Sequence, residues 1–170
     1  MTITYRDATP ADGPALDAFA RAIWIETFAH GSSPEDAAAY LATAYGPDGK
    51  LLADLHAAAA RFRLALRGDA VVGYAKLNPP WLPDVEPGAL QLSQLYVAAD
   101  LHGQRVGHVL LDWTIDTARE AGATALLLTV WEENARAYRF YLKRGFAYVG
   151  DYAFRVGAQV DTDHILRLAL

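Results

Sequence analysis

Residues 90–111, LQLSQLYVAADLHGQRVGHVLL, decide the fold. Apolar and β-prone side chains fill residues 90–97, which predicts a largely buried strand. From Val106 onward the apolar residues recur at helical spacing. The period changes over residues 98–103, so the stretch predicts a strand, a turn and the start of a helix in succession.

A turn of this kind is suited to binding an anion. The first amides of the helix have no carbonyl partners, and the helix dipole adds positive charge at the same place. The glycines do not identify the anion, because the four-residue spacing of Gly103 and Gly107 fits neither the dinucleotide nor the Walker pattern. On this stretch alone, a simple tight strand-to-helix turn explains the glycines better than a phosphate site does.

A second stretch, TVWEENARAYRFYLKRGF at residues 129–146, adds a more specific pattern. Together the two stretches resemble the GCN5-related N-acetyltransferase (GNAT) family, whose acetyl-CoA loop reads roughly (Q/R)xxGxG(A/G) after a strand ending in YV, followed later by NxxAxxxYxxxGF. His102 stands where the family has Gln or Arg. The positions that match are Tyr96, Val97, Gly103, Gly107, Asn134, Ala137, Tyr141, Gly145 and Phe146.

One position departs from the family pattern. Arg105 occupies the place of the first glycine in the GxG pair. A side chain there changes how the loop approaches a pyrophosphate, although a guanidinium can also add a charge-assisted hydrogen bond to it.

The resemblance implies an α/β fold, with a mixed, mostly antiparallel sheet of about seven strands and helices on both faces. It implies one N-acetyltransferase domain over residues 1–170 and acetyl-CoA as co-substrate. Backbone groups of Leu95 and Val97 are expected to contact the pantetheine arm. The full set of implied cofactor contacts is Leu95, Tyr96, Val97, His102, Gly103, Gln104, Arg105, Val106, Gly107, His108, Asn134, Ala137 and Tyr141.

Tyr141 is the expected catalytic residue. Spacing alone would make it a core aromatic, but it lies two helical turns after Asn134 and so on the same helix face. In the family, the tyrosine of this motif protonates the departing thiolate and the asparagine contacts the cofactor arm. The complete motif therefore favours Tyr141 as general acid.

No general base stands out in the sequence. Gln91 and Gln94 lie on the strand where a carboxylate would be useful, but an amide cannot take a proton. Glu26, Glu132 or a chain of waters remain as candidates. The histidines are too scattered to form a ligand set, so neither a metal site nor a metal requirement is expected.

Bulk properties restrict the partners. The 170 residues carry a net charge of -5, which argues against a nucleic-acid partner and favours a neutral or cationic acceptor. There is no cysteine, which excludes disulfides and a cysteine nucleophile. The start has no apolar signal core and no run of 18 apolar residues follows, so we expect a cytoplasmic protein without membrane association. The sequence leaves the oligomeric state open, a homodimer among the assemblies that it allows.

The remaining elements follow from periodicity and turn signals. The loop at residues 78–88 contains four prolines and is predicted to be irregular. Strands are predicted at 2–7, 61–67, 70–77, 90–97, 123–131, 146–156 and 163–170. Helices are predicted at 12–29, 34–45, 48–58, 103–121 and 134–144.

The acceptor is expected to be the primary amine of a small molecule. Residues 27–41 resemble the corresponding region of bacterial polyamine-type members, and acidic residues near them would attract a cation. Glu26 and Trp81 are the expected acceptor contacts, against the alternatives of a solvated edge carboxylate and an indole packed on the body. Two other functions stay open, namely a CoA-binding regulatory module without catalysis and a protein N-acetyltransferase.

Overall fold

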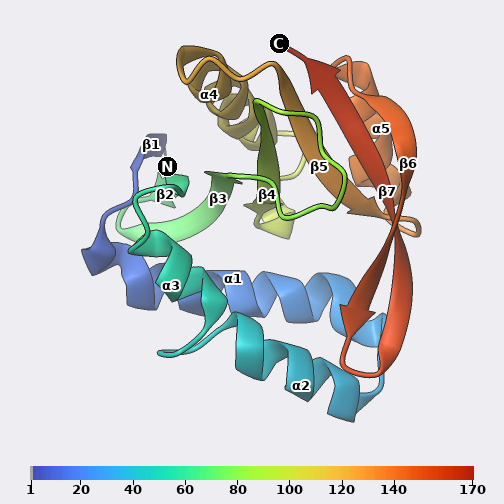
Figure 1. Cartoon of the computed structure of the whole chain (residues 1–170). Helices are drawn as coiled ribbons and strands as arrows, with labels where there is room; N and C mark the ends of the chain where they lie inside the picture. The colour runs from blue at the N-terminus through green and yellow to red at the C-terminus, as the bar shows by residue number, and fades with distance from the viewer. Residues whose placement is uncertain (1) are drawn as a thin grey trace.

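The computed structural model describes residues 2–170, which form a seven-stranded sheet in the order β1-β2-β3-β4-β5-β7-β6 (Figure 1). Every neighbouring pair is antiparallel except β4 and β5, which are parallel. The predicted mixed, mostly antiparallel sheet is therefore confirmed. The strands are β1 (Ile3–Asp7), β2 (Arg61–Arg67), β3 (Ala70–Asn78), β4 (Ala89–Val97), β5 (Ala125–Trp131), β6 (Ala147–Val156) and β7 (Gln159–Ala169).

Helices cover both faces of the sheet. Figure 1 shows three of them together below the strands, and the other two on the opposite face. The first group is α1 (Gly13–Phe28), α2 (Pro34–Ala44) and α3 (Lys50–Leu55); the second is α4 (Val106–Glu120) and α5 (Ala135–Lys143).

Alternation along the central strands builds a core on each face. In β2, Leu64 packs toward α1 and α2 while Ala65 packs toward α4. In β3, Tyr74 and Ala75 divide in the same way, and all four residues are fully buried. Because successive side chains of a strand point to opposite faces, one strand supplies both cores.

The sheet opens between β4 and β5, the parallel pair. β4 and β5 are in register at Ala89↔Ala125, Leu90↔Leu126 and Gln91↔Leu127, and no pairing follows. Residues 92–97 of β4 pair with β3 alone, so their other edge offers unpaired backbone groups. We call this opening between residues 92–97 and the later part of β5 the split.

The tip of the β6–β7 hairpin is fastened to the start of α2. The Ala158 N–H donates to Oδ1 of Asp36 at 2.6 Å, and Nε2 of Gln159 donates to the Gly31 carbonyl at 2.8 Å. Gly157 has φ +60°, and a Cβ added there would collide with Asp36. These contacts join the tip of this hairpin to the chain around the start of α2.

Three predicted elements differ from the structure by three residues or more at one end. α4 begins at Val106, not 103, because residues 99–101 form a separate 3-10 turn and Arg105 is not helical. β7 begins at Gln159, not 163, because a two-residue turn pairs Val156 directly with Gln159. The third helix is shorter than expected, spanning Lys50–Leu55.

Candidate functional site

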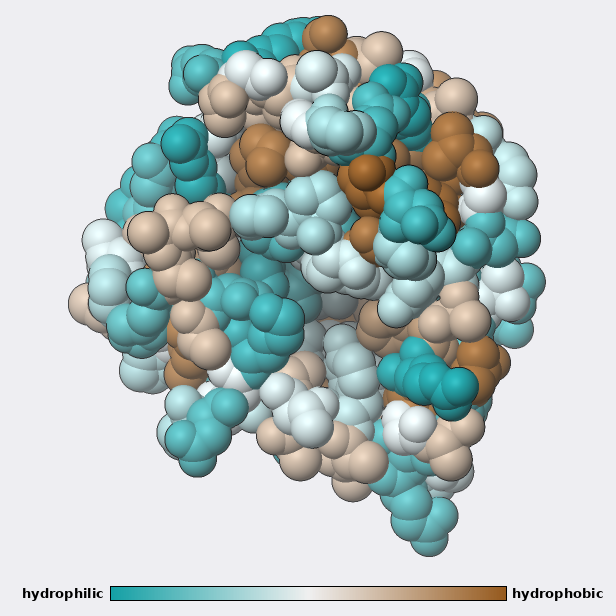
Figure 2. Space-filling view, in the orientation of Figure 1, coloured by the Kyte–Doolittle hydropathy of each residue, from teal (hydrophilic) through white to brown (hydrophobic). Residues whose placement is uncertain are grey.

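Two cavities meet at the split. The loop cavity, of about 360 Å³, lies among the end of β4, the start of α4 and α5. The chamber, of about 440 Å³, lies among helices α1–α3 and strands β3–β7. Figure 2 shows this face of the molecule hollowed near its centre, above α1 and α2. Residues that line both cavities are Phe28, Leu95, Tyr96, Asn134, Ala137 and Tyr141.

The start of α4 gives the loop cavity unpaired amides. The first helical hydrogen bond runs from the Val109 N–H to the Arg105 carbonyl at 3.1 Å, so the amides of Val106, Gly107 and His108 precede it. Nε2 of His102 lies 3.0 Å from the Val97 carbonyl and ties the loop to the end of β4. This geometry suits an anionic group above the first turn.

Arg105 keeps a backbone conformation that glycine favours. Its φ is +65°, in the left-handed region, and it lines the loop cavity. A non-glycine residue pays roughly 1–2 kcal/mol for that conformation. The replacement of the family glycine by Arg105 therefore leaves a left-handed turn in place and adds a cation to the cavity.

Nearly all the predicted cofactor contacts line the loop cavity. The exception is Gln104, whose side-chain Nε2 donates to the Asp100 carbonyl at 2.7 Å. Its backbone N–H is also used, donating to the Leu101 carbonyl at 3.1 Å. Gln104 thus holds the shape of the loop and offers no free amide.

Tyr141 lies where the two cavities join. Its side chain is 7% exposed, burial raises its pKa, and the hydroxyl is protonated at neutral pH. Phe140 and Phe146 pack against its ring, with centroids at 5.1 and 5.6 Å. Asn134 caps the same helix, its Oδ1 accepting from the Ala137 N–H at 3.2 Å.

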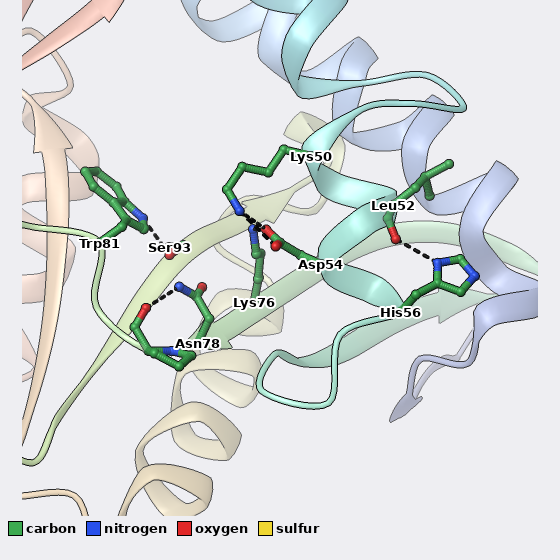
Figure 3. Close-up of polar contacts among 9 residues, drawn as sticks. Lys50, Leu52, Asp54, His56, Lys76, Asn78, Trp81 and Ser93 are labelled. Carbon is green, nitrogen blue, oxygen red and sulfur yellow. Dashed lines mark hydrogen bonds and ion pairs between the residues drawn. The ribbon is translucent and has the colours of Figure 1, made fainter.

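Aromatic side chains form much of the chamber wall. Trp81 contributes to it, and its indole Nε1 donates to the Ser93 hydroxyl at 3.0 Å (Figure 3). The Trp81 ring packs against Tyr152. The proline-rich loop is thus fixed to the body and also walls the chamber. Glu26 is exposed and lines the loop cavity, not the chamber, so the structure does not bring Glu26 and Trp81 together.

A carboxylate that sequence reasoning missed lies in the chamber. Asp163 of β7 is opposite Trp131 in β5 and Tyr152 in β6, and it is 9% exposed. In the sequence it falls at the predicted start of a strand, where an aspartate is unremarkable. The only signal was a charged residue within the alternating run VDTDHIL.

Burial raises the pKa of Asp163 to about 6. Asp161 and Glu132 shift that pKa in the same direction, whereas Thr129 and His164 lower it. Asp163 is therefore ionised at neutral pH and more basic than an ordinary aspartate. Glu132, the other candidate base, is exposed and lines neither cavity.

Lysines reach the chamber from its other side. Nζ of Lys76 in β3 pairs with Asp54 of α3, and Nζ of Lys50 lies 2.8 Å from the same carboxylate (Figure 3). Burial lowers the pKa of Lys76, which is 6% exposed, and its contact with Asp54 opposes that shift. Both lysines line the chamber.

Residues 2–170 contain neither a metal-binding group of side chains nor a membrane-spanning helix. No group of three or more His, Asp or Glu side chains in that range is placed to hold a metal ion. No helix in it is long and apolar enough to cross a membrane.

Comparison with known proteins identifies the family. The model of the acetyltransferase (GNAT) family matches residues 19–146. The chain belongs to the GNAT family. It is an N-acetyltransferase that depends on acetyl-CoA, as the sequence resemblance implied.

Relatives and solved structures agree with this assignment. An N-acetyltransferase of Lactobacillus delbrueckii subsp. lactis is 29% identical over 94% of this chain and 92% of its own length. An aminoalkylphosphonate N-acetyltransferase of Salmonella typhimurium is 34% identical over 50% of this chain and 55% of its own length. The PaiA N-acetyltransferase of Thermoplasma acidophilum, solved with coenzyme A, has the same fold, with a TM-score of 0.79 at 21% identity over 100% of both chains.

Proposed function

We propose that this GNAT enzyme transfers the acetyl group of acetyl-CoA to the primary amine of a small molecule by direct attack, with Tyr141 as general acid. The observation that carries the proposal is the position of Tyr141. It lines both cavities at their junction, where a thioester reaching in from one would meet an amine from the other. No covalent intermediate on the protein is needed.

The loop cavity is the proposed cofactor site. The pyrophosphate would accept hydrogen bonds from the amides of Val106, Gly107 and His108, with Arg105 as an added cation. The pantetheine arm would lie along the unpaired edge of residues 92–97, as an added strand does at a sheet edge. A strand amide there would polarise the thioester carbonyl.

The proton transfers follow from the two buried acids. An amine of ordinary pKa, about 10.4 for a lysine-like group, enters protonated and must lose a proton before it attacks. Asp163 is the proposed base, directly or through one water, because it is ionised in the chamber. Tyr141 then gives its proton to the thiolate as the carbon–sulfur bond breaks, and the phenolate that remains takes up the second proton that the nitrogen loses on becoming an amide.

The acceptor can be specified less closely. A polyamine remains the hypothesis from the sequence, and the carboxylates of Asp161 and Asp163 on the chamber wall are suited to a cationic group. The relatives' names differ, one being an aminoalkylphosphonate N-acetyltransferase and another a streptothricin acetyltransferase. A protein acceptor, a cytoplasmic location and a homodimer stay predictions from the sequence.

The test replaces Tyr141 by Phe. The substitution removes one hydroxyl and little volume, so turnover should fall by roughly 10²- to 10⁴-fold while acetyl-CoA affinity is kept. A panel of primary amines assayed by release of free thiol, with calorimetry for acetyl-CoA, measures both. Tyr138→Phe is the matched control, since Tyr138 lies on the same helix and lines neither cavity. Unchanged turnover in Tyr141→Phe would remove Tyr141 from the mechanism.

A further inference from the structure

The chamber has an unusual distribution of charge. Among residues 2–170, the charged side chains that line it are Lys50, Lys76, Asp161 and Asp163. The lysines come from α3 and β3 and the aspartates from β7, so the two signs enter from opposite sides of the split. The chamber therefore has a basic end and an acidic end.

The basic end carries an excess of positive charge. Lys50 and Lys76 share one carboxylate, that of Asp54 (Figure 3). The two ammonium groups and the carboxylate together carry a net charge of +1. Each ammonium has three N–H donors, and Asp54 does not use all of them. A second anion at this end would complete the pairing.

A neighbouring amide has unused hydrogen-bonding capacity. Gln94 lies directly opposite Lys76 on β4 and lines the same chamber. Its Oε1 is buried and has no partner among residues 2–170. An uncompensated buried acceptor costs free energy unless a donor such as a water or an ammonium satisfies it, so Gln94 makes the basic end polar without itself binding an anion.

We propose that the acceptor carries an anionic group as well as its amine. The carboxylate, phosphonate or phosphate of the acceptor pairs with Lys50 and Lys76, and its amine extends across the split toward Asp163 and Tyr141. The proposal rests on the proposed function, because it takes the chamber as the acceptor site. The proposed acceptors are small molecules that carry both a primary amine and a carboxylate, phosphonate or phosphate, and this class is distinct from polyamines.

A series of acceptors of equal length tests the proposal. The three compounds are 5-aminopentanoate, pentylamine and 1,5-diaminopentane, each with shorter and longer homologues to allow for the reach of the chamber. Hydrogen bonds to a charged group favour the amino acid, whose kcat/KM should exceed that of the matched alkylamine by about 10- to 100-fold. The diamine should be the poorest, because it places a second cation beside the lysines.

Two variants locate the effect. Lys50→Gln and Lys76→Gln should each lower the ratio of kcat/KM between the amino acid and the alkylamine. Lys143→Gln is the matched control, since the chain's third lysine is exposed on α5 and lines neither cavity. If Lys76→Gln fails to fold, Lys50→Gln decides the question, because the Lys50 side chain is 68% exposed and contributes little to the fold.

The outcomes separate the two proposals. Three results would overturn the inference and leave the proposed function standing. They are equal use of pentylamine and 5-aminopentanoate, a preference for the diamine, and an unchanged ratio of kcat/KM between the amino acid and the alkylamine in both folded variants. If none of the amines in the series is acetylated, the proposed function and the inference fall together.

Discussion

Burial raises the pKa of two acids in the site, Tyr141 and Asp163, and the shift has a different chemical consequence for each. The tyrosine is protonated at neutral pH with or without this shift, and a raised pKa makes it a weaker acid, so its proposed role rests on its position between the two cavities. For the aspartate, a pKa of about 6 leaves the group ionised at pH 7 while making it a stronger base. The same physical cause therefore makes Asp163 a stronger base and Tyr141 a weaker acid.

Asp163→Asn should reduce turnover by roughly 10²- to 10⁴-fold, because the amide cannot take a proton. In the wild type, kcat/KM should rise as pH increases through about 6, when Asp163 ionises. This titration is coupled to the charges of neighbouring groups, namely Asp161, His164, Glu132 and the Tyr40 phenol. Rate profiles of the two proteins from pH 5 to 9 provide the measurement. A variant that retains the step near pH 6 would assign it to another group.

The same substitution should increase stability at alkaline pH. The folded pKa of Asp163 is above the unfolded value of 3.8, so the native state binds more protons and its free energy of unfolding falls as pH rises from about 4 to 6. Asn carries no such penalty, and the gain should approach about 3 kcal/mol above pH 7 and vanish near pH 4. Urea denaturation at several pH values measures it. A gain that does not depend on pH would contradict this explanation.

The sequence singles out Tyr141 as a candidate site residue and passes over Asp163, for a physical reason. Tyr141 and Asn134 lie on one helix, where spacing fixes the relative directions of side chains. Asp163 acquires its role from pairing opposite Trp131 and Tyr152, in two different strands. Burial of a single carboxylate by such long-range pairing leaves no local pattern.

Among the elements, the start of α4 shows where periodicity loses precision. The apolar spacing correctly predicted a strand followed by a helix, but a 3-10 turn at Ala99–Leu101 and the left-handed Arg105 delay the helix to Val106. Sequence patterns place the interiors of elements better than their ends, because ends depend on individual backbone angles.

Gly107→Val should weaken CoA binding more than it weakens the fold. A Cβ at Gly107 would lie 3.8 Å from Phe140 and 3.9 Å from Val97, ordinary contact distances, so the helix tolerates it. The branched side chain would still cover amides that face the loop cavity. Calorimetry with CoA and a thermal melt should therefore separate the two effects.

Gly150→Val is the control for that variant. Gly150 lies in β6, with no atom within 4 Å of an added Cβ and no place in either cavity. It should leave CoA affinity unchanged. Equal CoA affinity in Gly107→Val and the parent would mean that the pyrophosphate binds elsewhere.

On the scale of the whole molecule, the sheet consists of two parts, β1–β4 and β5–β7, joined by only three paired positions. Periodicity and the family resemblance predicted the strands and the mixed sheet. The chamber could not be predicted in the same way, since its lining extends from Trp24 to Asp163 and comes from both parts.

If the pantetheine arm pairs with the free edge of β4, CoA should slow amide hydrogen exchange in residues 92–97. Hydrogen bonds to the ligand would replace bonds to water at that edge. Exchange in β2, which is paired on both sides, is the internal control. Mass spectrometry with and without CoA makes the comparison. If CoA changes the protection of β4 no more than that of β2, the arm takes another path.

The split also has a consequence during synthesis. Each part of the sheet is continuous in sequence, so residues 3–97 leave the ribosome with all of β1–β4 before β5 exists. At 5–20 residues per second, residues 98–131, which complete β5, need roughly 2 to 7 seconds more. Throughout that interval the nascent chain exposes β4 along its full length, with neither β5 nor a cofactor beside it. An open edge of this kind invites pairing with other chains, and we therefore expect the translating ribosome to be the stage at which this enzyme depends most on chaperones.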